Sequence, residues 1–149
     1  TYVKNVKNID SPRVALLNIG EEEEKGNLIT KAAYQLMKDS SQINFVGNVE
    51  GNDLFANKAD VIVCDGFTGN IVLKQAEALY GLVKERQIED DFFNRFNYEE
   101  YGGTPILGVN GNVLIGHGKS TPTAVKKMLK LAAEVAESQL PDKIRNAFN

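Results

Sequence analysis

The segment VIVCDGFTGNIVLK (61–74) joins an apolar run to a helical pattern through small and polar residues that could bind an anion. Its glycines permit close approach to the backbone, and the free N–H groups of a following helix attract negative charge. The candidate ligands are Asp65, Gly66, Phe67, Thr68, Gly69 and Asn70. Lys74, on the first turns of the helix, would add a positive charge. The alternative is an ordinary strand-to-helix turn with Thr68 as the helix cap.

Polar residues also follow two other apolar runs, RVALLN (13–18) and 44–49. The carboxyl ends of parallel strands meet at one edge of a sheet, where ligands of open α/β folds bind. We therefore expect further substrate-binding residues there, with Asn18 also assisting catalysis: Asn18, Glu21, Glu22, Lys25 and Asn48. Acids in a first helical turn are favoured by the helix dipole, so a solvated helix start is the alternative. We favour that alternative for Glu23 and Glu24.

His117 is the only histidine in the chain. Glycines flank it, and a helix start follows, so we predict a catalytic role for His117 with Gly118 and Ser120 near the substrate. A structural hydrogen-bonding role is the alternative. With Lys74, Asp65 and Asn18, His117 completes the candidate catalytic set. Cys64, the only cysteine, lies in an apolar run and is predicted to be an inert core thiol.

The elements that must position these residues alternate between strand and helix. Short apolar runs predict strands over 13–18, 44–49 and 59–64. Apolar residues recur at helical spacing between the first two runs, and again after the third run, beyond Asn70. This order predicts an α/β fold with a mostly parallel sheet and crossover helices.

The second half of the chain has a different pattern. Residues 84–101 are charged and aromatic, and two apolar runs then surround Asn110-Gly111, which favours a type I′ hairpin turn or a longer loop. Thr121 is a plausible cap and Pro122 the first residue of a long helix. Its predicted apolar stripe comprises Val125, Met128, Leu129, Ala132, Val135 and Ala136.

Composition excludes several functional classes. The chain has 149 residues and a net charge of −3, which provides no basic footprint for nucleic acid. A single cysteine allows no internal disulfide framework and fits the cytoplasm. No apolar run approaches the roughly 20 residues that span a bilayer. The first helical pattern, from Tyr2 to Ile9, starts without a cap, so we expect 1–149 to be the C-terminal portion of a larger catalytic domain.

Five motifs resemble the phosphate acyltransferases of bacterial phospholipid synthesis (the PlsX family). They are LLNIGEEEEKGN, INFVGNVEGNDLF, ADVIVCDGFTGNIVLK, YEEYGGTPILGVNG and HGKS, and the resemblance runs from Arg13 to the last helix. It implies transfer of a fatty acyl group from acyl carrier protein to inorganic phosphate, with no cofactor and no metal. It also implies a homodimer and a fold similar to the isocitrate and isopropylmalate dehydrogenases, here incomplete at the N-terminus. A glycerol-phosphate acyltransferase at the membrane is a further implied partner.

The chain also departs from this family. The family's N-terminal half, with its acidic and glycine-rich loop, has no counterpart in the sequence. Where the family has a longer, apolar helical excursion associated with membrane contact, this chain has the short, charged segment VKERQIEDDFFNRFNYEEY. That difference argues against direct membrane binding, although peripheral association remains an alternative to a purely cytoplasmic location.

Two other functions stay open. One is a different enzyme on the same scaffold, either an acetyl or butyryl phosphotransferase or a dehydrogenase, although no nucleotide fingerprint or set of metal-binding acids is evident. The other is a non-catalytic fragment that binds anions or a partner and lacks half of its site.

An acyl carrier protein would require a local basic patch on this acidic chain. The candidates are Lys119, Lys126, Lys127 and Lys130, at and just before the last long helix. The alternative is that these lysines only solvate an amphipathic helix.

Overall fold

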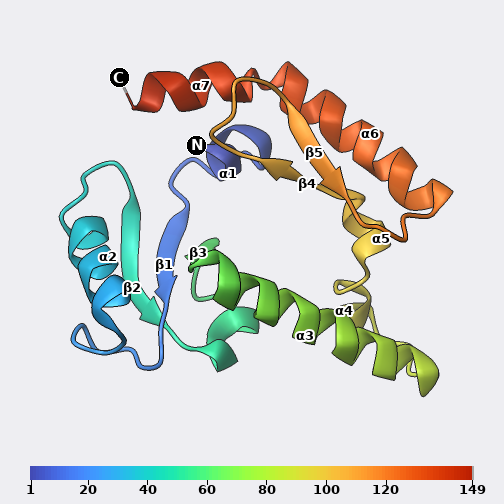
Figure 1. The fold of residues 1–149 in the computed structure, drawn as a ribbon, viewed down its shortest axis with the longest axis horizontal. Helices are drawn as coiled ribbons and strands as arrows, with labels where there is room; N and C mark the ends of the chain where they lie inside the picture. Colours follow the sequence, from blue (N-terminus) through green and yellow to red (C-terminus); the bar gives the residue numbers. More distant parts are fainter. Residues whose placement is uncertain (149) are drawn as a thin grey trace. The chain divides into compact units, whose positions relative to one another are not determined.

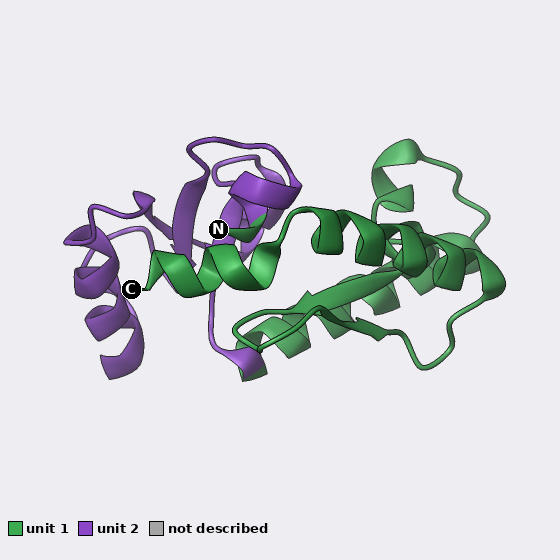
Figure 2. Ribbon diagram, turned by 90° about the horizontal axis from the view of Figure 1, so that it is seen from above, with its two compact units in different colours: residues 1–2, 67–149 green, residues 3–66 purple. Residues whose placement is uncertain are grey.

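The computed structural model describes residues 1–148. They form two compact units, which are coloured separately in Figure 2. The N-terminal unit is Val3–Gly66, and the C-terminal unit is the chain from Phe67 onward together with Thr1 and Tyr2. Each unit has its own sheet, and each is described by itself.

The N-terminal unit is built on a three-stranded parallel sheet in the order β2–β1–β3 (Figure 1). Val14, Ala15 and Leu16 of the central strand are buried, as is Val49 of its neighbour. Helix α2 packs against β1 and β2, and the side chain of Asn27 caps its start. The elements are α1 (Tyr2–Val6), β1 (Arg13–Leu17), α2 (Leu28–Lys38), β2 (Asn44–Val49), η1 (Gly51–Phe55) and β3 (Val61–Val63).

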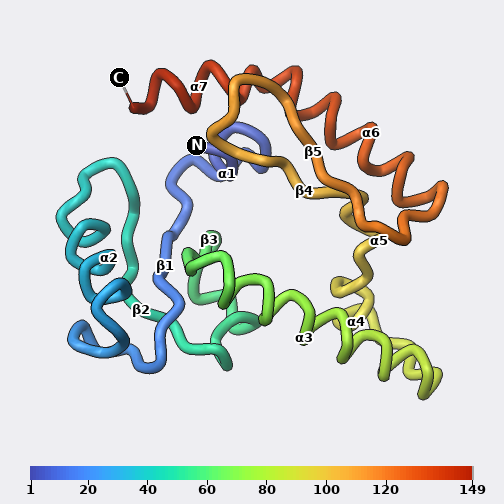
Figure 3. Tube along the Cα trace, in the orientation of Figure 1, coloured from blue at the N-terminus to red at the C-terminus, as the bar shows by residue number. Residues whose placement is uncertain are grey.

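The C-terminal unit combines an antiparallel hairpin with helices (Figures 1 and 3). Helix α6 packs along both strands of the hairpin and buries Ala124 and Val135. The elements are α3 (Gly66–Glu85), α4 (Asp91–Asn94), α5 (Tyr98–Tyr101), β4 (Gly103–Ile106), β5 (Val113–Gly116), α6 (Pro122–Glu137) and α7 (Leu140–Ala147).

Gly102 fixes the junction between α5, β4 and α6. Its φ is +72°, and a Cβ at this position would lie 2.4 Å from the backbone nitrogen of Met128 and 2.7 Å from the carbonyl oxygen of Ala124. Because these are backbone atoms of α6, no side chain can be accommodated without displacing the helix. The glycine therefore sets how closely α6 approaches the hairpin.

The parallel α/β architecture and the hairpin confirm the sequence predictions. Strand 44–49 has the predicted bounds, whereas the third strand is limited to 61–63. Thr121 caps α6 as predicted, since its hydroxyl oxygen accepts a hydrogen bond from the Ala124 N–H at 3.3 Å. The predicted stripe on α6 is only partly covered, because Val135 is buried while Val125 and Leu129 are exposed.

Three local predictions were wrong. Helix α3 begins at Gly66, so Thr68 lies within its first turn and is not its cap. Neither Asn110 nor Gly111 has the positive φ that a type I′ turn requires, and the longer loop 107–112 joins the strands instead, with Gly108 at φ +78°. Helix α1 ends at Val6, which leaves Ile9 outside the first helical face.

Within residues 1–148, no helix combines the length and the apolar character needed to span a bilayer.

Candidate functional site

The strand ends of the N-terminal unit are held together by two buried asparagines. Asn18 and Asn48 are each 7% exposed, and Asn18 Nδ2 donates to Asn48 Oδ1 at 3.2 Å. Asn18 Nδ2 also donates to the carbonyl oxygen of Lys25 at 3.1 Å, and its Oδ1 accepts from the Ile19 N–H at 2.9 Å. Asn48 Nδ2 donates to the carbonyl oxygen of Glu22 at 2.9 Å. We call these four bonds the asparagine clamp, and they fix the loop from 19 to 25.

Two of the four acidic side chains of this loop, Glu21 and Glu23, are paired with lysines. Glu21 lies 2.6 Å from Lys58, which also lies 2.8 Å from the largely buried carboxylate of Asp53. The hydrogen bond from Lys58, followed by one from the Glu50 N–H, lowers the pKa of Asp53. Glu23 pairs with Lys38 at 2.7 Å. The helix start predicted for Glu23 and Glu24 was wrong, because α2 begins at Leu28, with Asn27 as its cap, and has no acid in its first turn. The side chains of Glu22 and Lys25 are exposed.

The predicted anion turn spans the boundary between the two units. Asp65 and Gly66 end the N-terminal unit, and Phe67 begins the C-terminal unit within α3. Phe67 is 78% exposed, Asn70 is exposed, and Thr68 and Gly69 are half-buried. The structure thus describes 66–70 as the first turn of a long helix with no acid in it.

Cys64 directly precedes this turn and is half-buried. Burial, and secondarily the charge of Asp65, raises the pKa of its thiol. A raised pKa leaves little thiolate at neutral pH, which supports the prediction that Cys64 is not a nucleophile.

The C-terminal unit contains a pocket of about 510 Å³ formed by α3, the segment 95–101 and the hairpin. This volume is within the range of small-molecule sites. Its apolar lining includes Leu73, Ala76, Phe96, Tyr101 and Ile115, and its polar side chains include Glu77, Arg95, Tyr98, Thr104 and His117. Such a lining suits a ligand with an apolar body and a polar or charged end.

His117 leaves β5 at this pocket and is held by three neighbours. Its Nδ1 accepts from the Lys119 N–H at 3.2 Å, and its ring stacks on Tyr98 with centroids 4.4 Å apart. The Ser120 hydroxyl donates to the His117 carbonyl oxygen at 2.6 Å. Ser120 and His117 are therefore neighbours, as the HGKS motif implies, whereas Gly118 is exposed between them.

Lys74 pairs with Glu77, which lines the pocket, and lies well beyond the start of α3. Its Nζ lies 2.8 Å from Glu77 Oε2, and the same oxygen lies 4.0 Å from His117 Nε2. At 1.5 Å per residue, Lys74 is about 12 Å along the helix axis from Gly66. The structure thus brings Lys74 and His117 together through Glu77, a residue that we did not predict.

Glu77 had a local signal in the sequence, because residues three apart share a helix face and Lys74–Glu77 has that spacing. Tyr98 had none, since it is one of several aromatics in a charged segment. Within residues 1–148, no group of three or more histidine, cysteine, aspartate or glutamate side chains is arranged to hold a metal ion.

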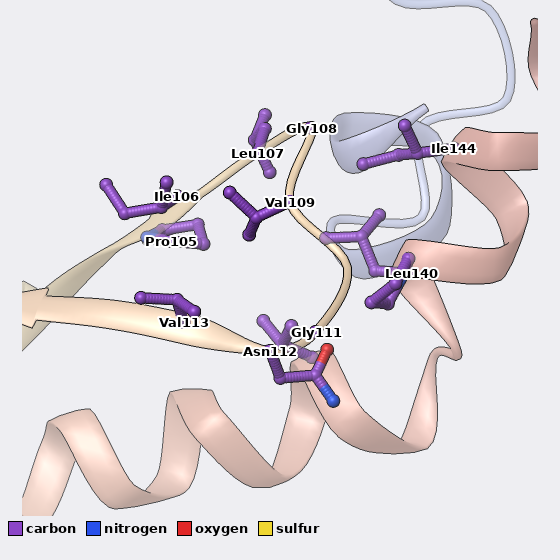
Figure 4. A pocket seen from close by; sticks show the side chains of 12 residues that line it. Pro105, Ile106, Leu107, Gly108, Val109, Gly111, Asn112, Val113, Leu140 and Ile144 are labelled. Atoms are coloured by element: carbon purple, nitrogen blue, oxygen red, sulfur yellow. The ribbon is translucent and has the colours of Figure 1, made fainter.

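A second, much smaller cavity of about 10 Å³ lies between the hairpin loop and α7 (Figure 4). It is lined largely by apolar side chains, among them Leu107, Val109, Leu140 and Ile144. It has room for about one water at most. This cavity is a packing feature of the hairpin and α7.

Comparison with known proteins adds an identification to this geometry. Residues 1–90 and 82–143 match the family described as fatty acid synthesis protein. The chain belongs to the fatty acid synthesis protein family. Proteins named phosphate acyltransferase are similar to it: it is 45% identical over 168 residues to one from Thermodesulfovibrio yellowstonii and 46% identical over 166 residues to one from Pelotomaculum thermopropionicum. Each comparison covers 99% of this chain and 48% of the relative.

A phosphate acyltransferase from Dictyoglomus turgidum is 40% identical, again over 99% of the chain and 50% of the relative. The chain thus spans about half the length of the curated relatives it matches. In this member of the fatty acid synthesis protein family, the predicted site residues fall into two sets. Asn18, Glu21, Glu22, Lys25 and Asn48 belong to the N-terminal unit with Asp65 and Gly66, and the remaining candidates belong to the C-terminal unit.

Proposed function

We propose that the protein transfers a fatty acyl group from an acyl carrier protein thioester to inorganic phosphate, forming acyl phosphate for phospholipid synthesis. The observation that carries this proposal is the 40–46% identity, over almost the whole chain, to proteins named phosphate acyltransferase. The family description, fatty acid synthesis protein, agrees with an acyl substrate.

The proposed step needs no covalent enzyme intermediate. A phosphate oxygen attacks the thioester carbonyl carbon, a C–O bond forms, and the C–S bond breaks with its electron pair leaving on sulfur. The thiolate then takes up a proton. Phosphate is already a nucleophilic anion at neutral pH, so the protein has to align the reactants and stabilise the developing oxyanion.

We assign the phosphate to residues 65–70, because a long helix starts there with small residues and no acid in its first turn. We assign the thioester end of the acyl group to the 510 Å³ pocket, where apolar walls adjoin His117 and Glu77, the ion-pair partner of Lys74. His117 Nε2 and the Lys74 ammonium would donate to the oxyanion or to the departing sulfur. For Asp65 and Asn18, which belong to the N-terminal unit, we keep the proposal from the sequence that they contact substrate.

The same proposal includes partners and a wider fold. Acyl carrier protein is the donor, and 1–149 forms the C-terminal portion of a catalytic domain similar to the isocitrate and isopropylmalate dehydrogenases. A homodimer is part of the proposal, supported by exposed apolar side chains on α3 such as Ile71, Leu79 and Leu82 that a second copy would cover. The proposed location is the cytoplasm, with product passing to a glycerol-phosphate acyltransferase at the membrane.

A second candidate function is binding without turnover. The observation that favours it is that the chain spans about half of its relatives, so an isolated chain could bind phosphate or carrier with an incomplete site.

A chimaera distinguishes the two candidates. This chain replaces the matched segment of the Thermodesulfovibrio yellowstonii phosphate acyltransferase, and acyl phosphate is trapped with hydroxylamine while release of carrier thiol is followed. We expect both products in equal amounts and only in the presence of phosphate. A folded chimaera that binds acyl carrier protein but forms neither product would overturn the proposal and favour binding without turnover.

The phosphate assignment has its own test in crystals soaked with phosphate or sulfate. We expect an anion within hydrogen-bond distance of the backbone N–H groups of residues 66–70. A turn that is packed under other residues, with no room for an anion, would contradict the assignment even if acyl transfer is observed.

A further inference from the structure

We infer that Glu77 is a positioning residue that orients His117 and Lys74 toward the substrate in the C-terminal pocket. This inference deepens the proposed function and rests on it, since it assigns His117 and Lys74 to the acyl thioester. It concerns a residue with no local marker of catalysis, which lies in the middle of α3.

The first argument is that the other sides of His117 are already occupied. Nδ1 accepts a backbone hydrogen bond from Lys119, and one face of the ring is stacked on Tyr98. An accepting Nδ1 means that the proton of the neutral imidazole is on Nε2. Nε2 is therefore the ring atom available to a substrate, and it is the atom that faces Glu77.

The second argument is that one carboxylate oxygen lies near both proposed donors. Glu77 Oε2 lies 2.8 Å from Lys74 Nζ and 4.0 Å from His117 Nε2. The 2.8 Å distance is that of a charge-assisted hydrogen bond, whereas 4.0 Å is longer than a hydrogen bond. Because Glu77 accepts no hydrogen bond from Nε2, the single proton of Nε2 stays available to the substrate while the carboxylate faces the ring.

The third argument concerns what each side chain does without Glu77. The Lys74 side chain is largely exposed and would be free to extend into water. His117 would keep its contacts with Lys119 and Tyr98 but lose the acceptor that faces Nε2. Glu77 is only half-buried, on a helix face at the pocket. Its loss should therefore disturb the alignment of the two donors more than the stability of the fold.

A direct test uses the fact that the chain has a single histidine, so its imidazole nitrogens give one pair of NMR signals. In ¹⁵N-labelled chain, E77Q is expected to shift the His117 Nε2 signal and E77D to restore it in part, because the carboxylate is kept. The matched control is E85Q, which removes an exposed glutamate from the same helix and is expected to leave His117 unchanged. Identical ¹⁵N chemical shifts of His117 in wild type and E77Q would overturn the inference, whether or not the enzyme forms acyl phosphate.

Kinetics of the complete enzyme give a second test. E77Q is expected to lower kcat on the order of tenfold while the KM for phosphate stays within about twofold. In the double variant E77Q/H117Q, the loss of kcat is expected to be smaller than the product of the two single losses, because part of the effect of Glu77 acts through His117. Fully additive effects would overturn the inference. If the wild-type enzyme forms no acyl phosphate, the proposed function fails, while the NMR test still decides the role of Glu77.

Discussion

The two units of the molecule use polar side chains at strand ends in different ways. In the N-terminal unit, Asn18 and Asn48 are buried, and their side chains form hydrogen bonds with each other and with the backbone of the loop from 19 to 25. In the C-terminal unit, His117 follows β5 at an open pocket, and its Nε2 lies beyond hydrogen-bond distance from Glu77. The rule that ligands of open α/β sheets bind near the carboxyl ends of parallel strands applies to Asn18 and Asn48, whereas β5 belongs to an antiparallel hairpin.

The difference shows that a strand end marks a candidate position but not a role. A buried amide whose donors and acceptor are satisfied stabilises the loop, and breaking those bonds costs the free energy of desolvating the remaining partners. A half-buried imidazole at the wall of a pocket contributes little to stability and can act on a ligand. We therefore expect substitutions in the N-terminal unit to affect stability and those at the pocket to affect turnover.

The largest effect is expected for His117→Ala. Removing the imidazole should lower acyl-phosphate formation on the order of a hundredfold, as loss of a proton or hydrogen-bond donor in a transition state does. The melting temperature should fall by less than about 4 °C, because the histidine is not a core residue. Asn112→Ala, an exposed position in the same hairpin, is the control. A large loss of stability with normal specific activity would show that His117 is structural.

The next effect is expected for Asn48→Ala. This change leaves Asn18 and the carbonyl oxygen of Glu22 without a buried partner, so the free energy of unfolding should fall by about 2 kcal/mol in urea titrations. Asn44→Ala, an exposed position on the same strand, should change it by less than about 0.5 kcal/mol. If Asn48→Ala leaves stability intact and abolishes turnover, the asparagine clamp is part of the substrate site.

A smaller effect is expected for charge reversal on α6. Lys127 is engaged with Glu100, whereas Lys119, Lys126 and Lys130 of the predicted carrier patch are exposed, the last two on α6. K126E/K130E should raise the KM for acyl carrier protein about tenfold at low salt, and less at high salt, with the KM for phosphate unchanged. The control K4E/K7E makes the same charge change on exposed lysines of the N-terminal segment. Equal effects of both double variants would mean that the carrier docks elsewhere.

The smallest effect concerns acid stability of the N-terminal unit. Asp60 accepts hydrogen bonds from the Arg13 side chain and its backbone N–H, which lower the pKa of Asp60 below its usual 3.8. Because the folded-state pKa is the lower one, this stabilisation is present above about pH 4 and is lost as the pH falls toward the folded-state pKa.

Asp60→Asn should therefore lower the melting temperature at pH 7 and reduce its further decline in acid. Asp10→Asn, at an exposed position, serves as the control. An identical acid profile in wild type and Asp60→Asn would show that the pair with Arg13 has no net effect on stability.

Local sequence patterns predicted much of the fold. The bounds of strand 44–49 and the Thr121 cap follow from short-range rules, since an apolar run and an N-cap are both local features. The start of α3 was misplaced because glycine, threonine and asparagine have weak helix propensity, and the tertiary structure overrides it. The prediction of a type I′ turn at Asn110-Gly111 was wrong because β4 ends at Ile106 and β5 begins only at Val113, so the strands are shorter than the apolar pattern suggested.

The site was harder to predict for a related reason. The sequence drew attention to Lys74 and His117 by residue type, but the carboxylate of Glu77 that lies between them depends on how α3 and the hairpin approach each other. The stacking of Tyr98 on His117 is equally non-local. The three-residue spacing of Lys74 and Glu77 is local, but no spacing rule within one segment places His117 or Tyr98 beside them.

Cys64 provides a chemical reporter that is already present in the chain. Its thiol is half-buried after the edge strand β3, and its raised pKa keeps the thiolate scarce at neutral pH. Alkylation by a maleimide should therefore be slow in the folded protein and limited by opening of this strand. With no second cysteine in the chain, the labelling rate measured by mass spectrometry would give the local opening free energy of the N-terminal unit without any engineered probe.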